Sequence, residues 1–103
     1  MNLDDIAVIE GNSITSERSY YEAVQRAING GEAWKFQGRI GRTLMGTIEA
    51  GYCLLGQFAS VDFYGSTVPS RSEIAAGSKG SRKYVVAHRG EAWAILMEAV
   101  GAE

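Results

Sequence analysis

The sequence predicts an α+β fold, in which a small and mostly antiparallel sheet of three to five strands is covered by an N-terminal and a C-terminal helix. Apolar residues recur with a helical period near both ends of the chain, and they alternate with polar residues in between. The links between the alternating segments are short, which favours antiparallel pairing. With 103 residues, of which 46% are hydrophobic, we expect one domain over residues 1–103 with one core.

Two segments have the period of a helix. Residues 16–29 form the first, because Thr15 or Ser16 can cap its start and Gly30-Gly31 can end it. Its apolar face consists of Tyr20, Val24, Ala27 and Ile28. Residues 90–100 form the closing helix, and its apolar stripe consists of Trp93, Leu96, Met97 and Val100.

Three segments have the pattern of strands. Residues 32–37 alternate, with Trp34 and Phe36 on one face. Residues 83–88 (Lys-Tyr-Val-Val-Ala-His) are rich in residues that favour strands. Residues 57–64 show the clearest alternation, which predicts a half-buried strand. The side of that strand expected to face the core carries Ala59, Val61 and Phe63, and the other side carries Ser60 and Asp62.

Residues 42–55 fit two interpretations. Leu44, Ile48 and Leu54 share one side of a strand, and we favour strands with a turn near Ala50-Gly51. A helix fits nearly as well, with an apolar face of Leu44, Met45, Ile48, Tyr52 and Leu55. The glycines at 46 and 51 would each cost such a helix about 1 kcal/mol relative to alanine.

Residues 65–83 form a predicted loop of turn formers and small polar residues between two predicted strands. The loop carries the only proline, and its four basic residues and one acid give it a local charge of +3 in a chain of −2. Loops of this length are uncommon inside compact domains, and they tend to be either functional or disordered.

Charge is distributed unevenly along the chain. Residues 1–33 have a net charge of −4, residues 34–90 of +5 and residues 91–103 of −3. Acidic helices beside a basic sheet would explain this pattern, and a site for an anion is the alternative.

Two glycine pairs at a spacing of three lie within basic segments. The first, Gly38-Arg-Ile-Gly41, resembles the Gly-x-x-Gly loop of KH domains, which clamps a nucleic-acid backbone. The resemblance covers about fifteen residues, and Gln37 stands where that family is apolar, so we assign no family from it. The second, Gly77-Ser-Lys-Gly80, has the backbone freedom, hydroxyls and cations that can wrap an anion. It lacks the Walker A order, we expect no helix to start from it, and a flexible solubilising loop is the alternative.

Catalytic chemistry has few candidates. Cys53 and His88, the only residues of their types, are the obvious pair for nucleophilic catalysis, since a thiolate needs a nearby base. Apolar neighbours on both sides favour a core position for Cys53. A serine of the loop, Ser70 or Ser72, is a further nucleophile to test. One cysteine and one histidine cannot complete a zinc site without carboxylates, so we expect no metal and no cofactor.

We therefore expect a small, non-enzymatic binding protein of the regulatory or accessory kind found in bacteria and phages. The 65–83 loop and nearby aromatic residues would dock on a macromolecular partner, most simply a protein, and a homodimer is possible. A nucleic-acid-binding module with a basic central face is one alternative, and a small enzyme or ligand-binding protein with a pocket near Cys53 and His88 is another. We expect no membrane partner, and the lack of cysteine pairs and of a leader favours the cytoplasm. The predicted partner- or anion-binding residues are Arg71, Lys79, Arg82, Lys83, Lys35, Arg39 and Arg42.

Overall fold

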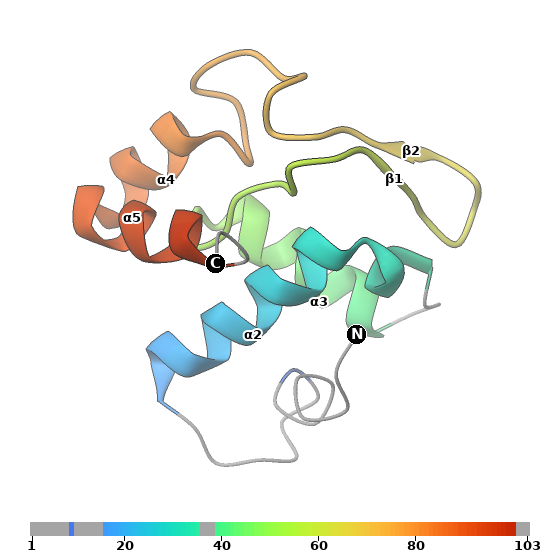
Figure 1. The fold of residues 1–103 in the computed structure, drawn as a ribbon, viewed down its shortest axis with the longest axis horizontal. Helices are drawn as coiled ribbons and strands as arrows, with labels where there is room; N and C mark the ends of the chain where they lie inside the picture. Colours follow the sequence, from blue (N-terminus) through green and yellow to red (C-terminus); the bar gives the residue numbers. More distant parts are fainter. Residues whose placement is uncertain (1–8, 10–15, 36–38, 101–103) are drawn as a thin grey trace.

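A computed structural model describes Ile9, residues 16–35 and residues 39–100 of the chain. Within these ranges the elements follow one another from an N-terminal helix through a short hairpin to two C-terminal helices (Figure 1). In chain order they are α2 (Glu17–Gly30), the 3-10 helix η1 (Glu32–Lys35), α3 (Arg39–Glu49), β1 (Ser60–Val61), β2 (Thr67–Val68), α4 (Arg82–Arg89) and α5 (Glu91–Ala99). The α+β class is supported by this mixture, although helices dominate it.

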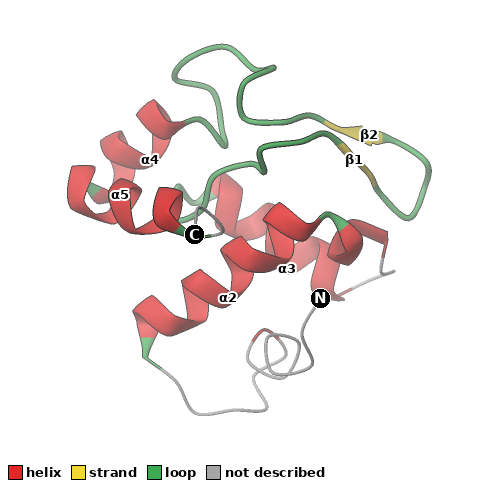
Figure 2. Cartoon of the chain, viewed as in Figure 1, coloured by secondary structure: helices red, strands yellow, loops and turns green. Residues whose placement is uncertain are grey.

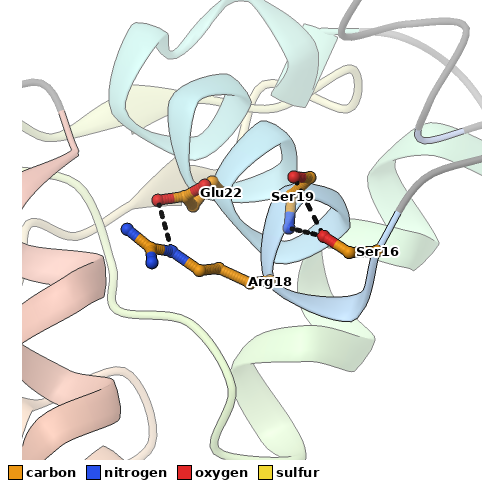
Figure 3. A network of polar contacts seen from close by, with 4 residues as sticks. All are labelled: Ser16, Arg18, Ser19 and Glu22. Atoms are coloured by element: carbon orange, nitrogen blue, oxygen red, sulfur yellow. Dashed lines mark hydrogen bonds and ion pairs between the residues drawn. The ribbon is translucent and has the colours of Figure 1, made fainter.

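The two predicted helices are confirmed as α2 and α5. Ser16 caps α2, because its hydroxyl accepts a hydrogen bond from the backbone N–H of Ser19 at 3.1 Å (Figure 3). One turn further, Arg18 and Glu22 form an exposed i,i+4 ion pair at 3.4 Å in the same view. Gly31 ends the helix in the left-handed conformation, with φ of 79°.

The strands favoured for residues 42–55 are wrong, because residues 39–49 form the helix α3. Leu44 and Ile48 are buried one turn apart, and Thr47 donates its hydroxyl to the carbonyl of Leu44 at 2.8 Å. Burying a leucine or isoleucine side chain contributes about 1.5–3 kcal/mol, more than the cost of about 1 kcal/mol for Gly46 in the helix. Gly51 lies beyond the helix end and therefore does not oppose it.

The strand predicted over residues 83–88 is also wrong. Ser81 caps α4 by accepting a hydrogen bond from the N–H of Tyr84 at 3.2 Å, so this helix starts directly after the Gly77–Gly80 segment. Val85 is fully buried and Val86 packs beside the core. A β-branched residue lowers helix propensity by only about 0.7 kcal/mol, and the burial of Val85 offsets that.

The strand predicted over residues 32–37 is a 3-10 helix at residues 32–35. Ala33 and Trp34 are both buried, which neighbouring residues of an alternating strand cannot achieve on a single buried face. Phe36 and Gln37 lie outside the described residues.

The sheet of the described residues has two strands, so a sheet of three to five is not confirmed (Figure 2). Strands β1 and β2 are antiparallel, with Ser60 opposite Val68 and Val61 opposite Thr67. The strand expected over residues 57–64 shortens to Ser60–Val61. The side of it predicted to face the core, at Ala59, Val61 and Phe63, is exposed instead.

The 65–83 segment is held along residues 55–56. Its first part supplies β2 and its last two residues start α4. Between them, the N–H of Arg71 donates to the carbonyl of Gly56 at 2.9 Å, and the N–H of Leu55 donates to the carbonyl of Gly80 at 3.0 Å. The segment is therefore a tethered insertion between β1 and α4, with a defined path.

The core lies where α2, α3, α5 and the segment 53–55 meet. Helix α4 packs on α5, α2 contacts α3 and α5, and η1 joins α2, α3 and the hairpin. The α4–α5 pair and the β1–β2 hairpin lie at opposite sides of the molecule (Figure 1). The largest fully buried apolar side chains are Ile28, Leu44, Ile48, Leu54 and Met97.

Candidate functional site

The turn of the β1–β2 hairpin is organised by Asp62. One carboxylate oxygen of Asp62 accepts hydrogen bonds from the N–H groups of Tyr64 and Ser66, each at 2.9 Å. The N–H of Asp62 donates to the carbonyl of Ser66 at 2.9 Å, and Gly65 takes the left-handed conformation with φ of 83°. These bonds fix the backbone that carries the side chains of residues 63 and 64.

Two aromatic rings project from this turn. Tyr64 is 80% exposed and Phe63 is 48% exposed, and their ring centroids lie 5.2 Å apart in an edge-to-face arrangement. The N–H of Phe63 donates to the carbonyl of Trp34 at 3.0 Å, which ties the turn to η1. The rings thus lie at the surface on a backbone with little freedom to withdraw them.

Exposed apolar side chains gather in this part of the chain. Six large hydrophobic residues are exposed within the described ranges, and four of them fall between residues 58 and 64. Those four are Phe58, Val61, Phe63 and Tyr64. Of these four, Phe63 and Tyr64 contact each other and line one hollow, so they form a continuous apolar surface of the kind that binds partners.

A shallow hollow of about 200 Å³ lies beside the two rings, between the hairpin turn, η1 and α3. Its lining combines buried Trp34 with exposed Met45, and it places the charged side chains of Arg42 and Asp62 at one site. We call the hollow and the residues Arg42, Met45, Asp62, Phe63 and Tyr64 the hairpin surface.

The sequence-predicted cations of the central region lie on this side of the fold. Arg42 lines the hollow, Arg39 lies one turn before it on α3, and Lys35 follows Trp34 at the end of η1. All three are exposed, and none forms an ion pair with a residue in the described ranges. Of the glycine pair that resembles a KH loop, Gly41 lies in the first turn of α3, and Gly38 lies outside the described residues.

The predicted basic residues of the 65–83 loop divide into two groups. Arg71, Arg82 and Lys83 line one cavity of about 410 Å³ together with Ile74, Ala76 and Val86. We call these six residues the basic cavity. Lys79 is exposed and does not line it.

Cys53 and His88 do not form a nucleophile–base pair. The Cys53 thiol is fully buried and donates to the carbonyl of Tyr21 at 3.7 Å, and burial raises its pKa to about 12. His88 is exposed, with Nδ1 2.9 Å from the carbonyl oxygen of Tyr84. Neither residue lines the hairpin hollow or the basic cavity. A neutral, enclosed thiol cannot act as a nucleophile at neutral pH.

The loop serines Ser70 and Ser72 belong to a hydrogen-bonded turn. The Ser70 hydroxyl lies 3.0 Å from the Ser72 hydroxyl, and the Ser70 N–H donates to the Glu73 carboxylate at 3.0 Å. That bond holds the pKa of Glu73 below its ordinary value and orders the backbone. These bonds stabilise the turn at residues 70–73.

Within the described ranges, no group of three or more His, Cys, Asp or Glu side chains could hold a metal ion. None of the helices described there has an apolar stretch long enough to cross a bilayer. Comparison with protein-family models, curated protein sequences and solved structures gives no match to this chain.

Sequence reasoning missed the outward position of Phe63 and the role of Asp62. The order Asp62-Phe-Tyr-Gly65 carries the signal of a turn, since aspartate favours its first position and glycine its last. Alternation alone placed Phe63 inward, because the pattern does not say which side of a short hairpin is covered.

Proposed function

We propose that this chain is a small, non-enzymatic binding protein that docks on a protein partner through the hairpin surface. The observation that carries the proposal is the aromatic pair Phe63 and Tyr64, exposed on a turn that Asp62 holds rigid. Holding the rings in place before binding reduces the entropy that docking would otherwise lose. Aromatic residues of this kind are frequent hot spots of protein interfaces.

The surroundings of the rings indicate the chemistry of the partner. The hollow beside them is lined by Trp34 and Met45, so it can take one apolar side chain. Arg42 lines the hollow, and Lys35 and Arg39 belong to η1 and α3, the elements beside it. None of the three has an ion-pair partner among the described residues. The partner we propose therefore presents an apolar residue flanked by carboxylates.

Nucleic acid is the second candidate, because the same residues combine cations with exposed rings. Single strands bind by stacking bases on aromatic side chains and by placing phosphates against basic ones. That mode predicts affinity for oligonucleotides that falls steeply as salt rises. Asp62 lines the same hollow and would repel a phosphate there, which favours a partner that places an uncharged apolar side chain in the hollow and its carboxylates outside it.

The experiment compares a double variant, Phe63→Ala with Tyr64→Ala, and a matched control, Phe58→Ala. Phe58 is 79% exposed but does not line the hollow, so its replacement removes an exposed ring of the same kind elsewhere. Proteins captured by the wild-type chain from the host extract, after nuclease treatment, are purified and their affinities measured by calorimetry. We expect the double variant to bind at least about 30-fold more weakly, equivalent to 2 kcal/mol or more, and the control to bind normally.

Equal affinity of the double variant and the wild type would contradict the proposal, provided that both melt at similar temperatures. Loss of all capture after nuclease treatment would support the nucleic-acid alternative instead. If the captured partner is a second copy of this chain, sedimentation equilibrium will show a dimer of the wild type that the double variant does not form. The single free cysteine supports a cytoplasmic setting for this activity.

A further inference from the structure

We propose that the basic cavity binds a small amphipathic anion, namely a singly charged head group of the carboxylate type attached to an apolar body. This site is separate from the hairpin surface and uses none of its residues. The proposal therefore stands or fails independently of the docking function.

Arg71 is a half-buried cation that forms no ion pair with a carboxylate of the described residues. Its Nε donates to the carbonyl of Leu55 at 2.7 Å, and one terminal nitrogen donates to the side-chain oxygen of Asn29 at 3.4 Å. Within the described ranges, no carboxylate lies within ion-pair distance of it. Burial lowers the pKa of Arg71, and the charge of Glu98 opposes that shift only partly. A partly desolvated guanidinium that lines a cavity favours an incoming anion.

The remainder of the cavity gives the ligand an apolar side. Ile74, Ala76 and Val86 supply aliphatic surface to the same cavity as the cations. The cavity is open to solvent, and its volume of about 410 Å³ lies at the lower end of the range of small-molecule pockets, about 300–1,000 Å³. An inorganic ion would leave most of this space and its apolar lining unused.

The neighbouring charges favour a single negative charge on the head group. Arg82 is held by Glu98 at 2.9 Å and by Glu91 at 3.3 Å. Lys83 is exposed at the rim and has no ion pair with a described residue. The carboxylates of Glu91 and Glu98 balance two of the three positive charges that line the cavity, so one positive charge remains for the ligand. A carboxylate matches that charge, whereas a phosphate monoester carries about −1.5 to −2 at pH 7.

The test titrates the full-length protein with octanoate and follows backbone amides by heteronuclear NMR. Octyl phosphate, octanol and octylammonium serve as comparison ligands with the same chain. We expect saturable shifts for residues 71–76 and 81–86 with octanoate, and affinities at least about tenfold weaker with octanol and octylammonium. Octyl phosphate should bind no more tightly than octanoate.

Two variants and one control connect binding to the cavity without disturbing Arg71, which holds the loop. Lys83→Ala removes the rim charge and should weaken octanoate about fivefold, equivalent to roughly 1 kcal/mol. Lys79→Ala makes the same change outside the cavity and should leave the affinity unchanged. Ala76→Phe fills the apolar side while keeping every charge, and it should abolish binding.

Three results would overturn the proposal. They are the absence of saturable shifts at millimolar octanoate, equal binding of octanol or octylammonium, and equal weakening by Lys79→Ala and Lys83→Ala. Tighter binding of octyl phosphate would overturn the singly charged head group. A fourth result, NMR shifts confined to residues 62–66, would also overturn the proposal, because it would place the ligand on the hairpin surface.

Discussion

Replacing Gln25 with methionine should remove about 3 kcal/mol of the free energy of unfolding. Gln25 lies on α2 and is fully buried, as is Leu54. Its side-chain oxygen accepts the N–H of Leu54 at 2.8 Å, and its side-chain nitrogen donates to the carbonyl of Leu54 at 2.9 Å and to Asn29 Oδ1 at 3.0 Å. One amide thus satisfies both backbone groups of a core residue that belongs to no helix or strand.

The magnitude follows from the groups left without partners. Methionine fills a similar volume, so the main loss is the pair of buried Leu54 backbone groups, at about 2 kcal/mol each. About 1 kcal/mol is recovered because methionine has no amide to desolvate. For a domain of about 100 residues, 3 kcal/mol corresponds to a fall of roughly 12 °C in Tm.

Urea unfolding followed by circular dichroism measures the change. Gln57→Met is the matched control, because Gln57 is exposed and its replacement should shift stability by no more than about 0.5 kcal/mol. A free energy of unfolding of Gln25→Met within about 0.5 kcal/mol of the wild type would refute the reasoning. It would mean that Leu54 finds other partners once the amide is gone.

A Gln25→Glu variant adds a pH signature to the same argument. The protonated acid can still donate to the carbonyl of Leu54, whereas the carboxylate cannot, and burial disfavours its charge. The pKa of this carboxyl should therefore lie above its unfolded value of about 4.3 in the folded state. Because the folded state then binds the proton more tightly, the stability of the variant should fall as pH rises from 4 to 8. A pH profile parallel to that of the wild type would contradict this account.

Three further predictions concern the glycines and the thiol. Gly46→Ala should stabilise the protein by about 1 kcal/mol in thermal melts, since Gly46 is helical and a Cβ there meets no atom within 4 Å; a loss of stability would argue against α3. Gly80→Ala should destabilise the protein more than Gly77→Ala, because an added Cβ at Gly80 would lie 2.6 Å from Leu55, whereas one at Gly77 meets no atom within 4 Å. Since φ is positive at both glycines, equal losses of stability would show that backbone strain alone matters. Cys53 should resist iodoacetamide until the protein unfolds, and rapid alkylation at pH 8 would contradict this. Because burial raises the pKa of Cys53 from 9.0 to about 12, its contribution to the free energy of unfolding should be lost as pH rises above about 9.

Local signals in the sequence were sufficient for α2 and α5. A capping serine at position 16, a helical apolar period and Gly31 at the end act within a few residues of one another, so they specify α2 without knowledge of the rest. The uneven charge predicted basic residues in the middle of the chain, and the structure places Arg71, Arg82 and Lys83 around one cavity. That Lys79 lies outside it depends on the path of the loop.

The segments that became α3 and α4 could not be assigned in the same way. Their apolar patterns are short and fit both the helical period and the alternation of a strand. Which of the two forms depends on which side chains become buried. Leu44 and Ile48 form one buried face only because α2 and η1 pack against α3. Val85 is buried only because α4 packs on α5. Burial energy of this kind exceeds the small propensity differences that a sequence reveals.

The candidate site, too, has features that the sequence predicts and features that only the packing of distant elements decides. The sequence by itself determined where the terminal helices run, where cations concentrate and that residues 57–64 alternate. Only the tertiary structure decided that the apolar side of that segment, including Phe63, faces outward, and that Gln25 supplies the partners of Leu54. The physical reason is that alternation fixes which side chains share a side, whereas the packing of distant elements decides which side is covered.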